Sequence, residues 1–95
     1  MDAESAETIA LSALAFLAED VARLGRFLAL TGLGPSELRQ EARTPRIQAA
    51  VLGHLLQDES LLLVFAASHG IAPEFIAPAH ALLEAQAGTA SNDES

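Results

Sequence analysis

The signals that begin and end helices occur twice in this chain, at a fixed spacing of 38 residues. Aspartate is a favourable residue before a helix, glycine ends a helix in the left-handed conformation, and proline is accepted in the first turn. Three such pairs recur: Asp20 with Asp58, Gly32 with Gly70, and Pro35 with Pro73. The spacing predicts two copies of one helix–Asp–helix–Gly–[Leu/Ile]–x–Pro–helix unit. The alternative is that the same signals simply suit any two short helical hairpins.

Apolar positions match at the same spacing, among them Leu17 with Leu55 and Phe27 with Phe65. We therefore expect an all-α protein, a compact bundle of five to six short helices made from two tandem three-helix units. The units cover about residues 6–43 and 44–85 of a single domain, residues 1–85. Residues 86–95 read QAGTASNDES, and their polarity predicts a disordered acidic tail.

Three details of this bundle follow from local patterns. Ser5 is expected to precede the first helix, at about residues 6–18. Val21 is expected on the buried side of the second helix, with its arginines on the other side, and Phe75 on the buried side of the last. Pro78 predicts either a kink in the last helix or its beginning.

The charge of the chain limits its partners. The formal net charge is −8, which opposes the approach of nucleic acids and anionic membranes. The chain has no lysine, and its basic residues all lie in one quarter of the sequence: Arg23, Arg26, Arg39, Arg43 and Arg46. We favour a solvated face with local ion pairs, then contact with an anionic protein. The interpretation that we favour least is contact with nucleic acid. In that case residues 28–38, which have the spacing of a helix-turn-helix, would place Arg39 and Arg43 on the recognition helix.

Residues 61–65 read LLLVF and are apolar all round their helix. A chain of 95 residues can hardly bury every side of such a helix. We expect a homodimer surface or a partner groove here, with Leu61 and Val64 as candidate contacts. The alternative is that this helix lies at the centre of the fold.

No arrangement of reactive residues stands out. The chain has no cysteine, and His54, His69 and His80 lack the spacing of a metal site. The acidic pairs at helix junctions are expected to cap helices, and no nucleotide-binding or nucleophile motif occurs. We expect no catalytic, cofactor-binding or metal-binding residue, and therefore no enzyme.

The N-terminal residues carry acidic side chains where a secretory signal would carry basic ones. No apolar run approaches the roughly 20 residues that a membrane span needs. The expected location is the cytoplasm.

The segment from Leu24 to Pro35 reads LGRFLALTGLGP and is followed by Leu38 and Arg39, which gives the motif F-L-A-L-T-G-L-x-P-x-x-L-R. Over about residues 6–84, the chain resembles a family of short bacterial proteins, largely alphaproteobacterial, known as a domain of unknown function. The resemblance implies an all-helical fold. It implies no activity, and no catalytic or binding residue.

These observations predict a small cytoplasmic interaction module that is not an enzyme and binds another protein or a second copy of itself. The candidate contacts are Arg39, Arg43, Arg46, Leu61 and Val64. The alternative is a helix-turn-helix-like nucleic-acid binder that uses the helix of Arg39 and Arg43.

Overall fold

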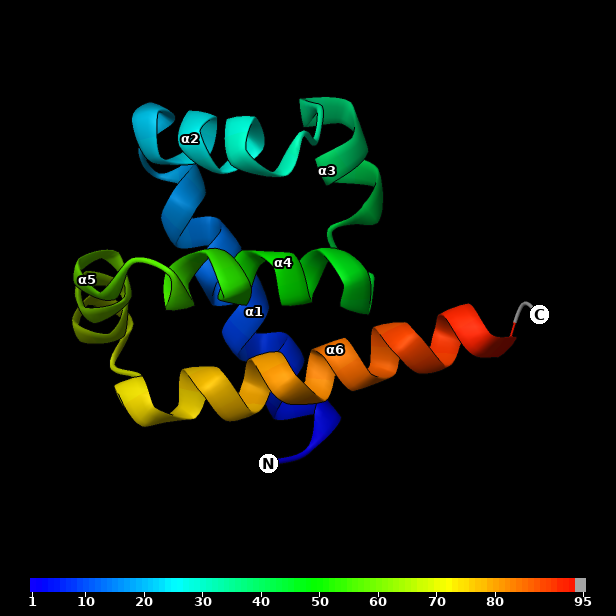
Figure 1. The fold of residues 1–95 in the computed structure, drawn as a ribbon. Coiled ribbons are helices and arrows are strands. Elements are labelled where there is room, and N and C mark those ends of the chain that lie inside the picture. Colours follow the sequence, from blue (N-terminus) through cyan, green and yellow to red (C-terminus); the bar gives the residue numbers. More distant parts are fainter. Residues whose placement is uncertain (94–95) are drawn as a thin grey trace.

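The computed structural model of this chain describes residues 1–93, with side chains described for residues 1–88. Six α-helices and one short 3-10 helix follow one another, and these residues contain no strand. The all-α fold is therefore confirmed (Figure 1). The elements are α1 (Ala3–Ala18), α2 (Val21–Thr31), α3 (Pro35–Glu41), α4 (Pro45–Leu56), α5 (Glu59–His69), η1 (Pro73–Phe75) and α6 (Ile76–Asp93).

The expected signals delimit α2 and α5. The carboxylate of Asp20 accepts hydrogen bonds from two backbone N–H groups of α2, and that of Asp58 accepts one from α5. Gly32 and Gly70 end these helices with φ of +77° and +64°, values that favour glycine because it has no Cβ. The local signals of the repeat are therefore present in both halves.

The third elements of the two halves differ in length. In the first half, Pro35 begins α3, a helix of 7 residues. In the second half, Pro73 begins the 3-residue η1, which is followed by the 18 residues of α6. A common three-dimensional arrangement of the two halves stays a prediction.

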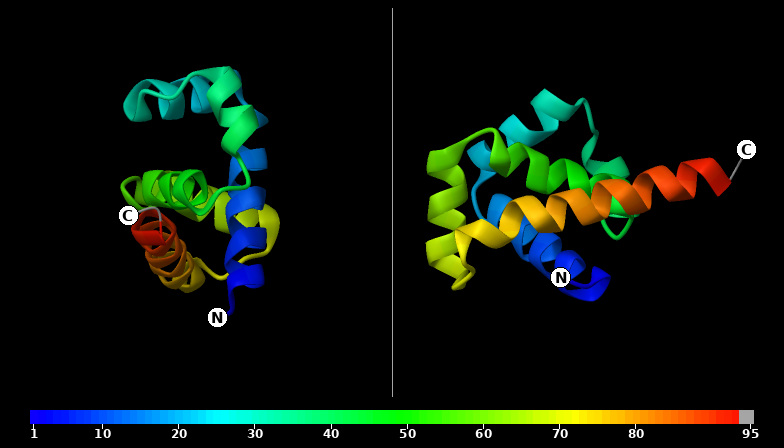
Figure 2. Two further views of the ribbon diagram at one scale, coloured as in Figure 1. Left: turned by 90° about the vertical axis from the view of Figure 1, so that its right-hand side faces the viewer. Right: turned by 60° about the horizontal axis from the view of Figure 1, so that its bottom comes forward.

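The core is formed where α1, α4 and α6 pack against one another, as the views of Figures 1 and 2 show. α5 covers one end of this group, and its Phe65 is fully buried. The largest fully buried side chains are Phe16, Phe27, Phe65, Leu17, Ile47, Leu52, Leu55, Ile76, Leu83 and Val51.

Three local expectations were wrong. α1 begins at Ala3, because the carboxylate of Asp2 accepts a hydrogen bond of 2.8 Å from the backbone N–H of Ser5. Val21 is 89% exposed, since the buried contact of α2 is made further along the helix by Phe27. Phe75 is half exposed, because it lies in η1, where no side chain is buried.

α6 begins two residues before Pro78, so Pro78 lies in the first turn of the helix. Backbone N–H groups in the first turn have no partner within the helix, and the N–H that proline lacks is therefore not missed there. The helix then continues to Asp93, through most of the segment that we expect to be a disordered tail. Its end projects beyond α1 and α4 in Figure 1. Residues 94 and 95 of that segment lie outside the described residues.

No single helix within residues 1–93 has the length and apolar character of a membrane span. α4 and α5 meet these criteria only as a pair, and the pair is bent by 111°.

Candidate functional site

Helices α2 and α3 and the turns beside them, residues 21–43, form an arm that stands apart from α4 and α6 (Figure 2). Buried Phe27 and Leu38 hold this arm, and Leu24, Leu28 and Leu33 pack against the core while partly buried. The ring of Phe27 meets the ring of His54 on α4 edge to face, with centroids 5.3 Å apart. The guanidinium of Arg23 covers the ring of Phe16 on α1. In α3, only Leu38 is buried. The arm leaves a groove on each of two sides.

The first groove, which we call the arm groove, lies between α1, α2 and α3 and has a volume of about 500 Å³. The residues that line this groove are apolar except for one arginine. They are Leu14, Ala18, Leu24, Leu28, Pro35, Leu38, Arg39 and Ala42. The side chain of Arg39 is exposed and makes one long hydrogen bond, of 3.4 Å, to the hydroxyl of Ser36. The groove therefore combines leucine side chains with a guanidinium that has free donor groups.

The structure separates the arginines that we expect to act together. Arg46 does not line the arm groove: its guanidinium lies 2.8 Å from the carboxylate of Glu41 and 3.9 Å from that of Glu37. The hydrogen bond to Glu41 raises the pKa of Arg46. Arg43 is exposed, lines neither groove and makes no hydrogen bond or ion pair within the described residues. Of the three candidates, only Arg39 lies at an apolar groove.

Charge is unevenly distributed along the chain. Residues 21–46 carry five arginines and two glutamates, a net charge of +3. The remaining residues carry eleven acidic residues and no lysine or arginine, a net charge of −11. The arm, residues 21–43, contains four of these arginines and both glutamates, a net charge of +2, and is therefore the basic part of an acidic protein. Helix α3 itself carries Glu37, Arg39 and Glu41, a net charge of −1.

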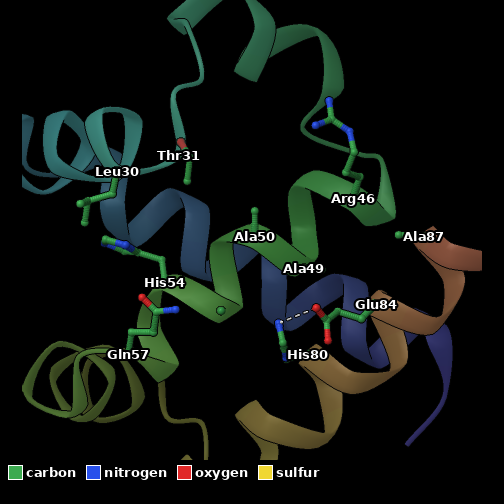
Figure 3. A pocket seen from close by; sticks show the side chains of 11 residues that line it. Leu30, Thr31, Arg46, Ala49, Ala50, His54, Gln57, His80, Glu84 and Ala87 are labelled. Carbon is green, nitrogen blue, oxygen red and sulfur yellow. Dashed lines mark ion pairs between the residues drawn. The ribbon is translucent and has the colours of Figure 1, made fainter.

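The second groove, the α4 groove, has a volume of about 520 Å³ and follows the uncovered face of α4 (Figure 3). Ala49, Ala50 and Gly53 line its middle, between Arg46 at one end and Gln57 at the other. Its sides are formed by residues from the end of α2 and from α6, namely Leu30, Thr31, His80, Glu84 and Ala87. Nε2 of His80 lies 3.7 Å from the carboxylate of Glu84.

The histidines have separate surroundings. Partial burial, and then the positive charge of Arg26, lower the pKa of His54, while Asp58 acts in the opposite direction. The ring of His69 packs against Phe65, with centroids 5.1 Å apart. Within the described residues, no group of three or more His, Asp or Glu side chains is placed to hold a metal ion.

The outward face of α5 carries exposed apolar side chains. Leu63 is 48% exposed and Val64 is 47% exposed, whereas Leu61 is half-buried and packs against the core. Leu61 and Val64 lie one turn apart on α5, but Leu61 is partly covered by the core while Val64 is exposed. Leu63, which the sequence did not single out, is exposed to the same extent as Val64.

Comparison with known proteins identifies a family and no function. A family model described as "Protein of unknown function (DUF3572)" matches residues 3–86. No curated protein matches the chain. No solved structure matches it.

Proposed function

The chain belongs to the DUF3572 family of proteins of unknown function, and we propose that it is a non-enzymatic protein-interaction module that binds an acidic amphipathic helix of a partner in the arm groove. The observation that supports this proposal most directly is the lining of that groove, which is apolar around the single guanidinium of Arg39.

The apolar part of the lining favours a helical partner segment. Leu14, Leu24 and Leu28 come from two helices and are each half-buried, so that a partner would complete their burial. Helices bind such grooves through apolar residues one turn apart. Removing apolar surface from water supplies about 25 cal/mol for each Å².

The charge of the arm favours an acidic partner. The guanidinium of Arg39 can hold a carboxylate through two parallel hydrogen bonds, and its bond to Ser36 leaves donors free for this. The net charge of +2 over the arm, residues 21–43, attracts an acidic segment, while the acidic remainder of the chain repels it elsewhere. A partner helix with acidic residues beside its apolar stripe meets both conditions.

The same observations weigh against the helix-turn-helix alternative. A recognition helix needs a basic surface, whereas α3 carries a net charge of −1 and Arg46 is paired with glutamates.

The test places a photo-reactive side chain at Ala18, which is exposed and lines the groove. The tagged full-length chain is irradiated in its native cells, and the cross-linked peptide is sequenced. We expect a segment with apolar residues at helical spacing and neighbouring Asp or Glu. Arg39→Glu, made in the chain that carries the photo-reactive side chain at position 18, should reduce its yield at least tenfold.

Arg43→Glu is the matched control, because it makes the same change of charge outside both grooves. The yield of cross-linked peptide with Arg43→Glu should stay within twofold of the yield without this substitution. Unchanged cross-linking of Arg39→Glu would refute the arm groove as the site. Capture of nucleic acid, lost steeply with added salt, would support the alternative function instead.

A further inference from the structure

We infer that the partner helix lies along α1 as α6 lies along α4, antiparallel to α1 and in contact with Leu11 and Ala15 as well as with the arm groove. This inference rests on the proposed function and adds to it the direction of the partner helix and the surface that this helix covers. Its basis is that one half of the chain covers with its own helix an apolar stripe that the other half leaves partly bare.

The helices of the two halves meet in matching ways. α1 packs against α2, and α4, the counterpart of α1 in the second half, packs against α5. α2 also contacts α4, and α5 also contacts α1, so that each of these two helices contacts the first helix of both halves. The third elements break the match. α6 packs along α4, whereas α3 makes no comparable contact with α1 within residues 1–93.

The sequence of α3 lacks the side chains by which α6 is buried. α6 buries Ile76, Ala79 and Leu83, each of which is at most 1% exposed. The residues 38 positions earlier are Leu38, Glu41 and Pro45. Only Leu38 can pack in the same way, because Glu41 is charged and is the last residue of α3, and Pro45 already begins α4. α3 therefore cannot cover α1 as α6 covers α4.

α1 carries an apolar stripe that the chain covers only in part. The stripe follows helical spacing and consists of Leu11, Leu14, Ala15 and Ala18. The two leucines are half-buried and the two alanines are exposed. Leu14 and Ala18 line the arm groove, and Leu11 and Ala15 continue the stripe by one turn toward the N-terminus of α1. A partner helix that follows this stripe therefore extends past the groove.

The counterpart stripe on α4 shows what covers such a surface. It consists of Ala49, Leu52, Gly53 and Leu56. Ala49 and Leu52 are buried, while Leu56, at the end of α4, is exposed. At Gly53, α4 and α6 lie so close that an added Cβ would be 3.1 Å from Nε2 of His80. The occupant of this stripe is a helix, and we expect the partner helix to carry apolar residues spaced like Ile76, Ala79 and Leu83.

The direction of the partner helix follows from the same comparison. In Figure 1, α4 runs toward α5, and α6 returns from η1 in the opposite direction. A partner helix that is antiparallel to α1 in this way passes Ala18 with an earlier part of its sequence and Ala15 with a later part. Since both helices rise by 1.5 Å per residue, three residues on α1 correspond to about three on the partner.

The test places the photo-reactive side chain at Ala18 in one full-length chain and at Ala15 in another. Both chains should capture the same partner segment in the native cells. The site that is cross-linked from position 15 should lie about three residues nearer to the C-terminus of the segment than the site cross-linked from position 18. The control is the same side chain at Ala67, an exposed alanine of α5, which should capture the segment at less than a tenth of the yield.

A substitution tests the same contact without moving the cross-linker. Ala15→Gln, made in the chain with the photo-reactive side chain at position 18, should lower the yield at least fivefold, because it places a polar side chain between the helices. It leaves the charge that attracts the partner unchanged. Ala67→Gln is the matched control and should keep the yield within twofold. Circular dichroism of each purified variant checks that the helices are intact.

The outcomes separate this inference from the proposed function. Capture from position 18 but not from position 15, or a cross-linked site that does not move toward the C-terminus of the segment, would overturn the inference and leave the arm groove as the binding site. An unchanged yield with Ala15→Gln would also overturn it. Capture of no segment from either position would refute the proposed function together with this inference.

Discussion

The guanidinium carbon of Arg23 lies 4.2 Å from the centre of the Phe16 ring, so that an arginine of α2 covers a buried aromatic side chain of α1. The same ring packs against Phe65 of α5, with centroids 5.4 Å apart. Phe16 therefore joins three helices, and Arg23 closes the cluster where α2 crosses it. Phe27 is the one fully buried residue of α2, and this contact adds to it and to the partly buried Leu24 and Leu28 in holding the arm.

Replacing Arg23 with Ala should lower the free energy of unfolding by about 1–2 kcal/mol, because it removes a cation–π contact and the packing of the side-chain stem. Arg23→Lys keeps the charge but not the planar stack, and should cost about half as much. Denaturation in urea measures both. Arg43→Ala, at an exposed arginine without a ring contact, should change stability by less than about 0.5 kcal/mol. An equal cost at the two positions would contradict the role of the ring.

Gly25 inside α2 and Gly32 just after its end should respond in opposite directions to the same substitution. Gly25→Ala should stabilise the protein by about 0.5–1 kcal/mol, because a methyl group there meets no atom within 4 Å and alanine favours the helix. Gly32→Ala should destabilise it by about 1 kcal/mol or more, because φ is +77°. Thermal unfolding followed by circular dichroism measures both changes. A gain at both positions would mean that α2 does not end in the left-handed conformation at Gly32.

The boundaries of α2 and α5 were predictable because each of their signals acts within a few residues. Asp20, Gly32 and Asp58 have the roles that their sequence neighbours indicate. The side of α2 that faces the core was not predictable in the same way. Helical spacing groups Val21 with Phe27, but the cation–π contact of Arg23 turns an apparently polar position toward the protein. A pattern that counts arginine as solvent-exposed misses such a contact.

The candidate sites were less predictable than the helices. The arm groove combines residues of three helices, and spacing along the chain says only that Leu14, Leu28 and Leu38 each lie on an apolar face. On α5, residues 61–65 are all apolar, so the sequence does not indicate which side of the helix packs against the core. The packing of Leu61 against that core left Leu63 and Val64 outside, and only the tertiary structure separates them. The polarity of the residues after 86 predicted a disordered tail, and it did not predict that α6 continues past residue 86.

Gly53 and His80 should be energetically coupled. A Cβ at position 53 would lie 3.1 Å from Nε2 of His80, closer than most such contacts allow, and the histidine is held toward Glu84. Alanine in place of glycine inside a helix usually raises the free energy of unfolding by roughly 1 kcal/mol, and Gly53→Ala alone should gain little of this. In the background of His80→Ala, the same substitution should realise most of it. A double-mutant cycle measured in urea should give a coupling of at least about 0.5 kcal/mol, and strict additivity would show that His80 moves aside without cost.

His54 should make the stability of the protein depend on pH. Burial and the charge of Arg26 lower its pKa from the ordinary value of 6.5, so the unfolded chain binds the proton first as the pH falls. The contribution of neutral His54 is therefore fully present above pH 6.5 and is lost progressively as the pH falls toward the lowered pKa of the folded state. Because the His54 ring packs against Phe27, this loss should loosen the arm. Urea midpoints measured between pH 7.5 and about 5, above the ordinary range of carboxylates, should fall for the unsubstituted chain and change less for His54→Gln. Arg26→Gln should move the titration of His54, followed by NMR, toward 6.5. A His54 that titrates at or above 6.5 in the unsubstituted chain would show that the ring is not enclosed between α2 and α4.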